Sequence, residues 1–152
     1  FWGYLLHKHG TVTPGLFIIC LASTILISTI FVDYRHYIIP NGYSLLMLLL
    51  GVGYMLTHID QWKNLLLGGI VAFLIFLLLM VFSGGNLGGG DVKLSAGIGL
   101  FIGLKGLMMY LMLAFLFGAF TSLALLMLKI KDRKDNIPFG PYMSIAFLYI
   151  LL

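Results

Sequence analysis

Long apolar segments follow one another along most of the 152-residue chain, and a turn signal or a polar cluster ends nearly every one of them. The clearest segment, 64–82, has about the 20 residues that a helix needs to cross a bilayer. The segments that predict helices are 16–32, 43–57, 64–82, 94–104, 107–128 and 141–152. The sequence therefore predicts an all-α, polytopic membrane protein, a bundle of about six transmembrane helices.

The composition excludes a water-soluble globular protein of this size. Hydrophobic residues make up 61% of the chain and charged residues 9%, and the mean hydropathy is +1.09. Little polar sequence separates the apolar segments, so we expect one membrane-embedded domain over residues 1–152. Residues 1–10 resemble the end of a helix that begins upstream, which favours a piece of a longer protein. Cys20 is the single cysteine, which excludes an internal disulfide and a multi-cysteine zinc site.

The basic residues predict an orientation in the membrane. The formal net charge is +4, and scattered lysines and arginines favour a membrane topology signal over a nucleic-acid partner. If the segment 16–32 ends in the cytoplasm, the cytoplasmic side holds Arg35, Lys93, Lys129, Lys131, Arg133 and Lys134, and the other side holds Lys8, Lys63 and Lys105. The positive-inside rule favours this arrangement. It puts the glycine-rich stretch 83–90 at the cytoplasmic face.

Two of the acidic residues stand out by their position. The chain has no glutamate, and three of its aspartates lie in polar surroundings: Asp60, Asp132 and Asp135. Asp33 and Asp91 instead adjoin apolar segments at the ends of different predicted helices, on the same side of the membrane. An ionised carboxylate is costly there and usually has a function. The alternative is that each caps a helix or pairs with Arg35 or Lys93.

Taken as a pair, Asp33 and Asp91 predict acid and base chemistry. Two carboxylates held close together cannot both ionise easily, so they share a proton, and one acts as a base while the other acts as an acid. Hydrolysis of a peptide bond needs only these groups and a water molecule. The glycines before Asp91 predict an irregular hinge that lets a substrate backbone come close.

Three motifs carry a resemblance to a known family. "GGGDVKL" at 88–94 resembles the GxGD motif of membrane aspartyl proteases, and "VDYRHYIIPN" at 32–41 is similar to the first-aspartate motif of type IV prepilin peptidases. "IPFGPYM" at 137–143 resembles the segment before the last helix of that family. The resemblance implies that Asp33 and Asp91 are the catalytic pair and that Gly88, Gly89 and Gly90 form the active-site loop. Lys93 is a possible auxiliary residue.

The resemblance also implies a substrate and a location. The family cleaves the short basic leader from prepilin or pseudopilin precursors, usually after a glycine, at the cytoplasmic face of the bacterial cytoplasmic membrane. Proteolysis of this kind uses no cofactor. Many members carry a further N-terminal region with zinc-binding cysteines, linked to N-methylation. A need for S-adenosylmethionine therefore arises only if the whole protein is also a methyltransferase.

Other interpretations of the sequence remain open. A proton-coupled transporter also uses membrane aspartates, although it more naturally holds them near the midplane, often with internal repeats. A non-catalytic assembly factor would keep the fold and survive the loss of either aspartate. His36 follows Asp33 by three residues, but no second histidine at helical spacing supports a metal site, so we expect none.

Overall fold

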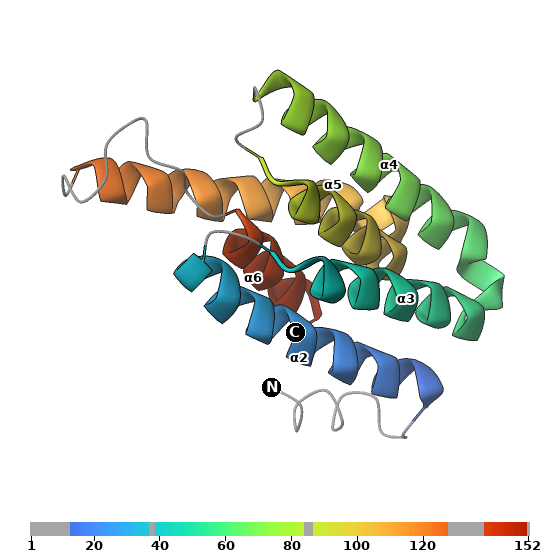
Figure 1. The fold of residues 1–152 in the computed structure, drawn as a ribbon. Coiled ribbons are helices and arrows are strands. Elements are labelled where there is room, and N and C mark those ends of the chain that lie inside the picture. Colours follow the sequence, from blue (N-terminus) through green and yellow to red (C-terminus); the bar gives the residue numbers. More distant parts are fainter. Residues whose placement is uncertain (1–12, 37–38, 84–86, 128–138, 152) are drawn as a thin grey trace.

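The computed structural model describes residues 13–36, 39–83, 87–127 and 139–151, and within them the chain is helical, with no strand. The described residues form five α-helices and a short 3-10 helix (Figure 1): α2 (Pro14–His36), α3 (Asn41–Thr57), η1 (Ile59–Gln61), α4 (Trp62–Phe82), α5 (Gly89–Met127) and α6 (Gly140–Leu151). The predicted all-α class is confirmed. The expected stub 1–10 and the basic segment 129–137 lie outside the described residues.

Helix α5 combines the two predicted helices 94–104 and 107–128. Its backbone leaves the helical conformation at Gly103, where φ is 71° and ψ is 173°. This is a left-handed conformation that favours glycine, and a Cβ there would overlap the side chain of Asn64. The same Asn64 accepts a hydrogen bond from the backbone N–H of Lys105 (3.2 Å). The start of α4 therefore stabilises the bend that divides α5 into a first half and a second half.

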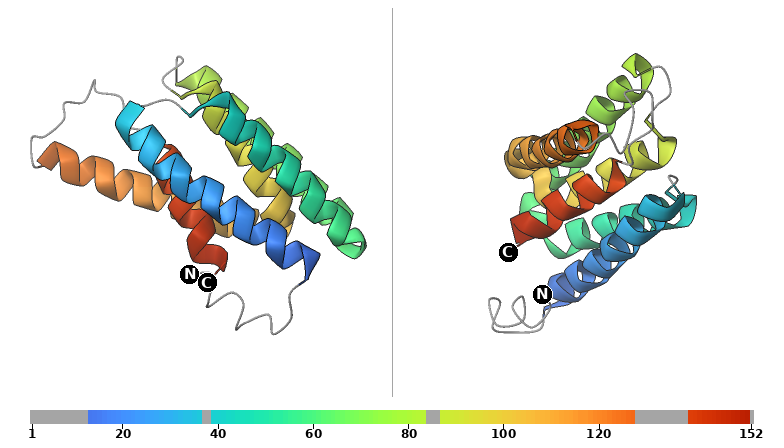
Figure 2. Two further views of the ribbon diagram at one scale, coloured as in Figure 1. Left: turned by 60° about the horizontal axis from the view of Figure 1, so that its bottom comes forward. Right: turned by 90° about the vertical axis from the view of Figure 1, so that its left-hand side faces the viewer.

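The first half of α5 forms the centre of the bundle. In Figure 1, α2, α3, the first half of α5 and α4 follow one another side by side, and the second half of α5 turns away from the first. Helix α6 packs against both α5 and α2, as the views of Figure 2 also show. Helices α4 and α5 approach so closely that a Cβ at Gly99 would meet the Gly68 carbonyl oxygen at 2.5 Å. Such small-residue contacts are typical of helices packed inside a membrane.

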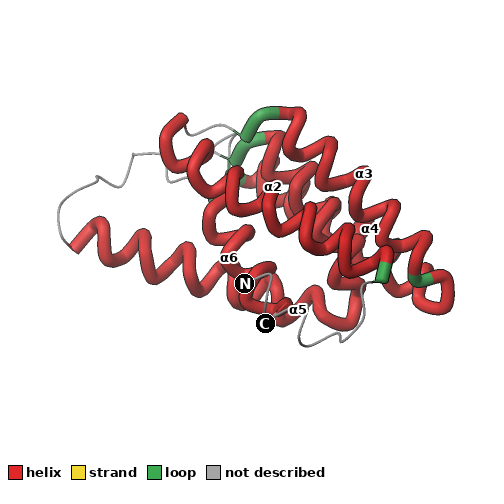
Figure 3. The backbone as a smooth tube through the Cα atoms, turned by 90° about the horizontal axis from the view of Figure 1, so that it is seen from below, coloured by secondary structure: helices red, strands yellow, loops and turns green. Residues whose placement is uncertain are grey.

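The outer surface of the bundle is apolar. Three stretches are long and apolar enough to cross a membrane, Pro14–Asp33, Ile59–Phe82 and Gly89–Ala124, while α3 and α6 are shorter apolar helices. Large side chains such as Phe82, Phe120 and Met108 are exposed on this surface. The loops that the structure describes between the helices are short (Figure 3). A contiguous apolar exterior of this kind suits lipid, and the chain is a membrane protein.

Candidate active site

Asp33 and Asp91 lie at the same end of the bundle and are both buried. Asp33 is in the last turn of α2 and is 3% exposed, and Asp91 is the third residue of α5 and is 8% exposed. Gly140, which bonds Asp33, and Gly90, which directly precedes Asp91, both pack against Ile39. The starts of α3, α5 and α6 and the end of α2 meet here, as Figures 1 and 2 show. The structure thus brings the two predicted catalytic residues together.

The Asp33 carboxylate is held by the start of α6. The backbone N–H of Gly140 donates a hydrogen bond to Asp33 Oδ2 (3.1 Å). Gly140 is the first residue of α6, where a backbone N–H has no partner inside the helix and the helix dipole favours a negative charge. A Cβ at Gly140 would meet Asp33 Oδ2 at 2.5 Å, so only glycine allows this approach. "IPFGPYM" therefore supplies a direct contact to the first aspartate.

The Asp91 carboxylate is held by the turn that precedes α5. Its Oδ2 accepts a hydrogen bond from the N–H of Gly88 (3.2 Å), and the N–H of Asp91 donates to the Gly88 carbonyl oxygen (3.0 Å). These two bonds close a tight turn and fix one side of the carboxyl group. The other oxygen, Oδ1, is buried and has no hydrogen-bond partner in the described chain. This oxygen is available to a water molecule or a substrate.

The structure corrects the expected glycine hinge at Gly89 and Gly90, whereas Gly84 and Gly85 lie outside the described residues. Gly89 and Gly90 are the first two residues of α5, and the one described glycine with a positive φ is Gly103, far from the site in the sequence. Gly90 matters for a different reason, because a Cβ there would lie 3.0 Å from the Cβ and the carbonyl oxygen of Ile39. Gly89 has open space around it. Close packing against Ile39 therefore explains why glycine occupies position 90, and its backbone needs no special conformation.

Ile39 is a site residue that the sequence reasoning did not single out. It is buried, and it touches the positions of both Gly90 and Gly140, whose Cβ would lie 2.8 Å from Ile39 Cδ1. Ile39 therefore lies between the starts of α5 and α6, which hold the two carboxylates. The only sequence signal for Ile39 was its place in the segment "VDYRHYIIPN" (32–41), which resembles the first-aspartate motif of a known family.

Two polar contacts tie the start of α3 to α5. Ser44 Oγ donates to the Gly90 carbonyl oxygen (3.1 Å), and this contact was also missed by the sequence reasoning. Lys93 Nζ donates to Asn41 Oδ1 (3.2 Å) at the exposed surface. Across the described chain, neither aspartate forms an ion pair with Arg35 or Lys93. The predicted auxiliary residue Lys93 thus joins two helices and does not contact the carboxylates.

Metal ligands do not gather at this site in the part of the chain that is described, where no group of three histidine, cysteine or acidic side chains occurs. The side chain of His36, and Asp132 and Asp135, lie outside the described residues. Helix capping, the alternative expected from the sequence, does occur, since each aspartate accepts a bond from a backbone N–H beside a helix start. Capping leaves Asp91 Oδ1 unused, and it does not explain why two capping carboxylates are buried at the same end of the bundle.

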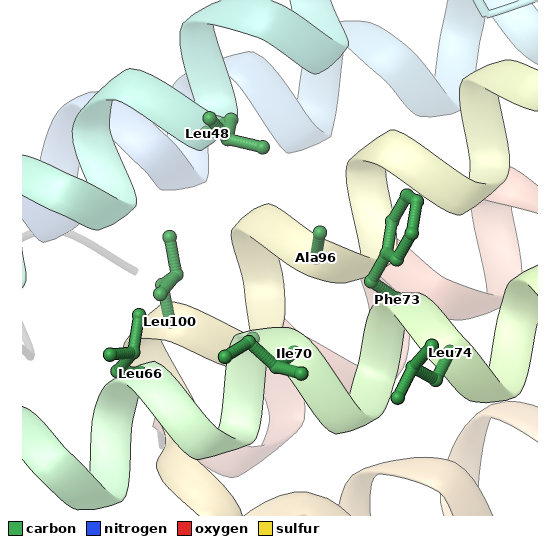
Figure 4. A pocket seen from close by; sticks show the side chains of 8 residues that line it. Leu48, Leu66, Ile70, Phe73, Leu74, Ala96 and Leu100 are labelled. Carbon is green, nitrogen blue, oxygen red and sulfur yellow. The ribbon is translucent and has the colours of Figure 1, made fainter.

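An apolar cavity of about 290 Å³ opens between α3, α4 and α5. Its lining, drawn in Figure 4, is entirely apolar: Leu48, Leu66, Gly69, Ile70, Phe73, Leu74, Ala96 and Leu100. Leu48 lies one helical turn after Ser44, and Ala96 lies shortly after Asp91, so this cavity follows the site along the first half of α5. It offers no acid or base, and it suits apolar chains.

Comparison with known proteins gives consistent matches. The type IV leader peptidase family model matches residues 20–123. The chain is 36% identical to the prepilin leader peptidase/N-methyltransferase of Xanthomonas campestris over 121 residues, which is 76% of this chain and 42% of the relative. It is 30% identical to the protein of that name from Aeromonas salmonicida over 152 residues, 93% of this chain and 52% of the relative.

The Bacillus subtilis protein of the same name is 29% identical over 131 residues, 83% of this chain and 53% of the relative. The chain thus spans about half the length of the curated relatives it matches. No solved structure matches significantly.

Proposed function

Because the chain belongs to the type IV leader peptidase family, we propose that it is the core of an aspartic endopeptidase that removes the leader from prepilin or pseudopilin precursors. One observation carries the proposal. Two aspartates from α2 and α5 are buried beside helix starts that both pack on Ile39, each is held through one oxygen by a backbone N–H, and Asp91 keeps a buried oxygen that has no partner among the described residues. A pair arranged in this way suits a reaction in which one proton moves between two carboxyl groups.

The reaction needs one carboxylate and one carboxylic acid. The carboxylate accepts a proton from water as the water oxygen bonds to the scissile carbonyl carbon, and the carboxylic acid gives its proton to the carbonyl oxygen. The resulting diol collapses when the carbon–nitrogen bond breaks: the newly protonated carboxyl group gives its proton to the leaving nitrogen, and one diol hydroxyl gives its proton to the other carboxylate as the carbonyl forms again, which restores the starting acid. Protons balance over the cycle, and no covalent intermediate forms.

The enclosure of the pair supports the same reaction. Electrostatic interactions gain strength where water is excluded, and both carboxyl groups are almost fully buried. Gly88 and Gly140 fix the orientation of the carboxyl groups before a substrate arrives. Fixed geometry matters because misplacing a catalytic group by about 1 Å can cost roughly a hundredfold in rate.

We place the enzyme in the bacterial cytoplasmic membrane, with the site at the cytoplasmic face and lipid around the apolar exterior. The distribution of basic residues supports this orientation. The substrate is then a precursor with a basic leader followed by an apolar segment in the same membrane, and nucleic acid has no part in the activity. Peptide cleavage by the two aspartates uses no cofactor, whereas any methylation by the whole protein would consume S-adenosylmethionine.

The transporter alternative is disfavoured by the depth of the pair. Transport sites lie near the bilayer midplane, where helices are interrupted. Asp33 is three residues from the end of α2, and Asp91 is two residues from the start of α5. The interruption of α5 at Gly103 is at the opposite end of its first half. This arrangement suits a site reached from one membrane face.

The test is cleavage of a synthetic precursor that carries a basic leader, a glycine and an apolar segment, with the full-length chain in detergent or in vesicles. Mass spectrometry of the products is expected to show one cut directly after the glycine. The double variant Asp33→Asn/Asp91→Asn is expected to insert normally and to release no product. Product formation by the double variant at the wild-type rate would refute the aspartyl mechanism.

A further inference from the structure

Ser44 uses its hydroxyl group differently from most serines and threonines of the bundle. In the described helices these hydroxyls usually donate to a carbonyl oxygen three or four residues earlier in their own helix, as Thr29 does to Ile25 (2.9 Å). Such local bonds are common because the hydroxyl reaches the preceding turn. Ser44 instead donates to the Gly90 carbonyl oxygen (3.1 Å), 46 residues away in the sequence. Ser44 is 0% exposed, so this bond lies in the interior.

The oxygen that Ser44 contacts belongs to the peptide bond between Gly90 and Asp91. The N–H of the same peptide bond donates to the Gly88 carbonyl oxygen (3.0 Å), and the N–H of Gly88 donates to Asp91 Oδ2 (3.2 Å). The peptide plane that leads into Asp91 is therefore held at its oxygen by α3 and at its N–H by the turn before α5. A carbonyl oxygen has two lone pairs, so the bond from Ser44 leaves one for a helical partner.

Helix α3 keeps Ser44 in place because its following turns pack directly on α5. A Cβ at Gly97 would lie 3.0 Å from the Met47 carbonyl carbon and 3.1 Å from the Leu48 backbone nitrogen. Further along α3, a Cβ at Gly51 would lie 3.0 Å from the Gly97 carbonyl oxygen. The two backbones thus approach closely over the stretch that follows Ser44. This close approach leaves the hydroxyl little freedom to move away from α5.

Ile39 supports the same peptide bond by packing alone. Its Cβ and its carbonyl oxygen would lie 3.0 Å from a Cβ at Gly90, and its Cδ1 would lie 2.8 Å from a Cβ at Gly140. Such contacts limit how far the start of α5 moves, but they have no preferred direction. A hydrogen bond has one, and it weakens when donor and acceptor rotate out of line. Ser44 therefore supplies a directional contact to this peptide bond that packing cannot replace.

We propose that Ser44 is a positioning residue for Asp91. Its hydroxyl holds the Gly90 carbonyl oxygen, which fixes the plane of the peptide bond and with it the direction in which the Asp91 side chain leaves the backbone. Ser44 acts through the backbone and takes no part in proton transfer. Its effect on catalysis rests on the proposed function, whereas its hold on the peptide bond does not.

Two pairs of chains isolate the hydroxyl group. Ser44→Ala lacks the hydroxyl that the wild type has, and Ser44→Val lacks the hydroxyl that Ser44→Thr has, at nearly the same side-chain shape. In each pair the chain without the hydroxyl is expected to have a kcat roughly three- to tenfold lower. KM is expected to stay unchanged, because the lost bond orients the catalytic group and does not contact the substrate.

The matched control is Ser95→Ala. Ser95 is also 0% exposed, and its hydroxyl donates to the Val92 carbonyl oxygen (2.8 Å) within its own helix. Its loss should lower the melting temperature, as the loss of a buried hydrogen bond does, without lowering kcat per folded enzyme. A purely structural Ser44 would behave in the same way as Ser95.

A spectroscopic measurement tests the bond itself without any substrate. Asp91 is the single aspartate that directly follows a glycine. A full-length chain with carbonyl-13C glycine and 15N aspartate therefore gives one carbonyl–nitrogen correlation, from the peptide bond between Gly90 and Asp91. In Ser44→Ala the carbonyl signal is expected to move to higher field, because its oxygen loses a hydrogen bond. In Ser95→Ala the signal should stay in place.

An unmoved carbonyl signal in Ser44→Ala overturns the inference, and so does a kcat equal to that of Ser95→Ala. If the wild-type chain cleaves no precursor, the proposed function fails. The carbonyl signal then still decides whether Ser44 holds the peptide bond before Asp91.

Discussion

The two ends of the helix bundle contain similar residues in different surroundings. At one end, Asp33 and Asp91 are buried between helix ends. At the other end, Asp60 is exposed beside Lys63 and Lys105 around an open polar cavity of about 600 Å³, which Gln61, Trp62 and Asn64 also line. Both ends supply carboxylates and cations. Among the described residues, only one end removes its carboxylates from solvent, and there the helix starts beside both carboxyl groups pack on Ile39.

Close approach of helix starts produces this difference. Gly90 and Gly140 lack side chains where Ile39 and Asp33 need the space, so α5, α6 and the chain before α3 converge on the pair. At the opposite end, Asn64 instead bonds the bend of α5, and its neighbours stay open to solvent. The presence of charged residues therefore does not distinguish the two ends of the bundle. The difference lies in the packing, which excludes water from around Asp33 and Asp91 and leaves Asp60 exposed.

The largest expected effect comes from the carboxylates themselves. Asp33→Asn and Asp91→Asn should each lower the rate of precursor cleavage by at least about 10² to 10⁴, because an amide cannot accept or return the proton. Asp60→Asn should stay within about twofold of wild type, since exposed charges contribute little. Cleavage is measured per unit of membrane-inserted protein. Equal losses in all three variants would remove the distinction between the two ends.

The next largest effect is expected at the start of α6. Gly140→Ala places a methyl group against Asp33 Oδ2 and Ile39, so Asp33 must move, and the rate should fall about a hundredfold. Gly42→Ala is the matched control at the start of α3, where nothing lies within 4 Å of the new Cβ. Thermal unfolding of both variants separates a displaced carboxylate from a lost fold. A Gly140→Ala variant as active as Gly42→Ala contradicts the assigned contact.

A smaller effect is expected from the neighbouring glycines of α5. Gly90→Ala brings a methyl group to 3.0 Å from Ile39 and should slow cleavage about tenfold, because a displacement of tenths of an ångström is enough to absorb it. Gly89→Ala meets nothing and should keep full activity, with a gain of about 0.5–1 kcal/mol in helix stability. If Gly89→Ala and Gly90→Ala lost cleavage activity equally, close packing at Gly90 would not explain the result, and the hypothesis of a hinge at these glycines would be favoured again.

The smallest effect is expected from the surface cation near the site. Lys93→Gln loses one exposed hydrogen bond to Asn41 and should change the cleavage rate by no more than about twofold. Lys105→Gln, at the opposite end of the bundle, should also change the cleavage rate by no more than about twofold. Rates of both variants are compared at low and high salt. A strong, salt-dependent loss in Lys93→Gln alone would show that this lysine acts on the catalytic pair or on the substrate.

The sequence by itself determined the class of the protein, and it singled out the two aspartates that the structure buries at one end of the bundle. Apolar segments of membrane length fixed the helices, because a backbone in lipid must satisfy its own hydrogen bonds. Asp33 and Asp91 were found because a carboxylate beside a membrane segment is rare and costly. Both inferences depend on a local pattern in the sequence, and a local pattern can be recognised without knowing how the rest of the chain folds.

Only the tertiary structure decided how the two aspartates are held. Gly140 bonds a residue 107 positions away, and Ile39 lies between two helix starts whose approach no local pattern encodes. The sequence also predicted a hinge at Gly89 and Gly90, where α5 is already helical, and it predicted a break between residues 104 and 107 without indicating that Gly103 would adopt the positive φ. A glycine permits close contact and unusual backbone angles equally well, and only the neighbouring helices determine which of the two it provides.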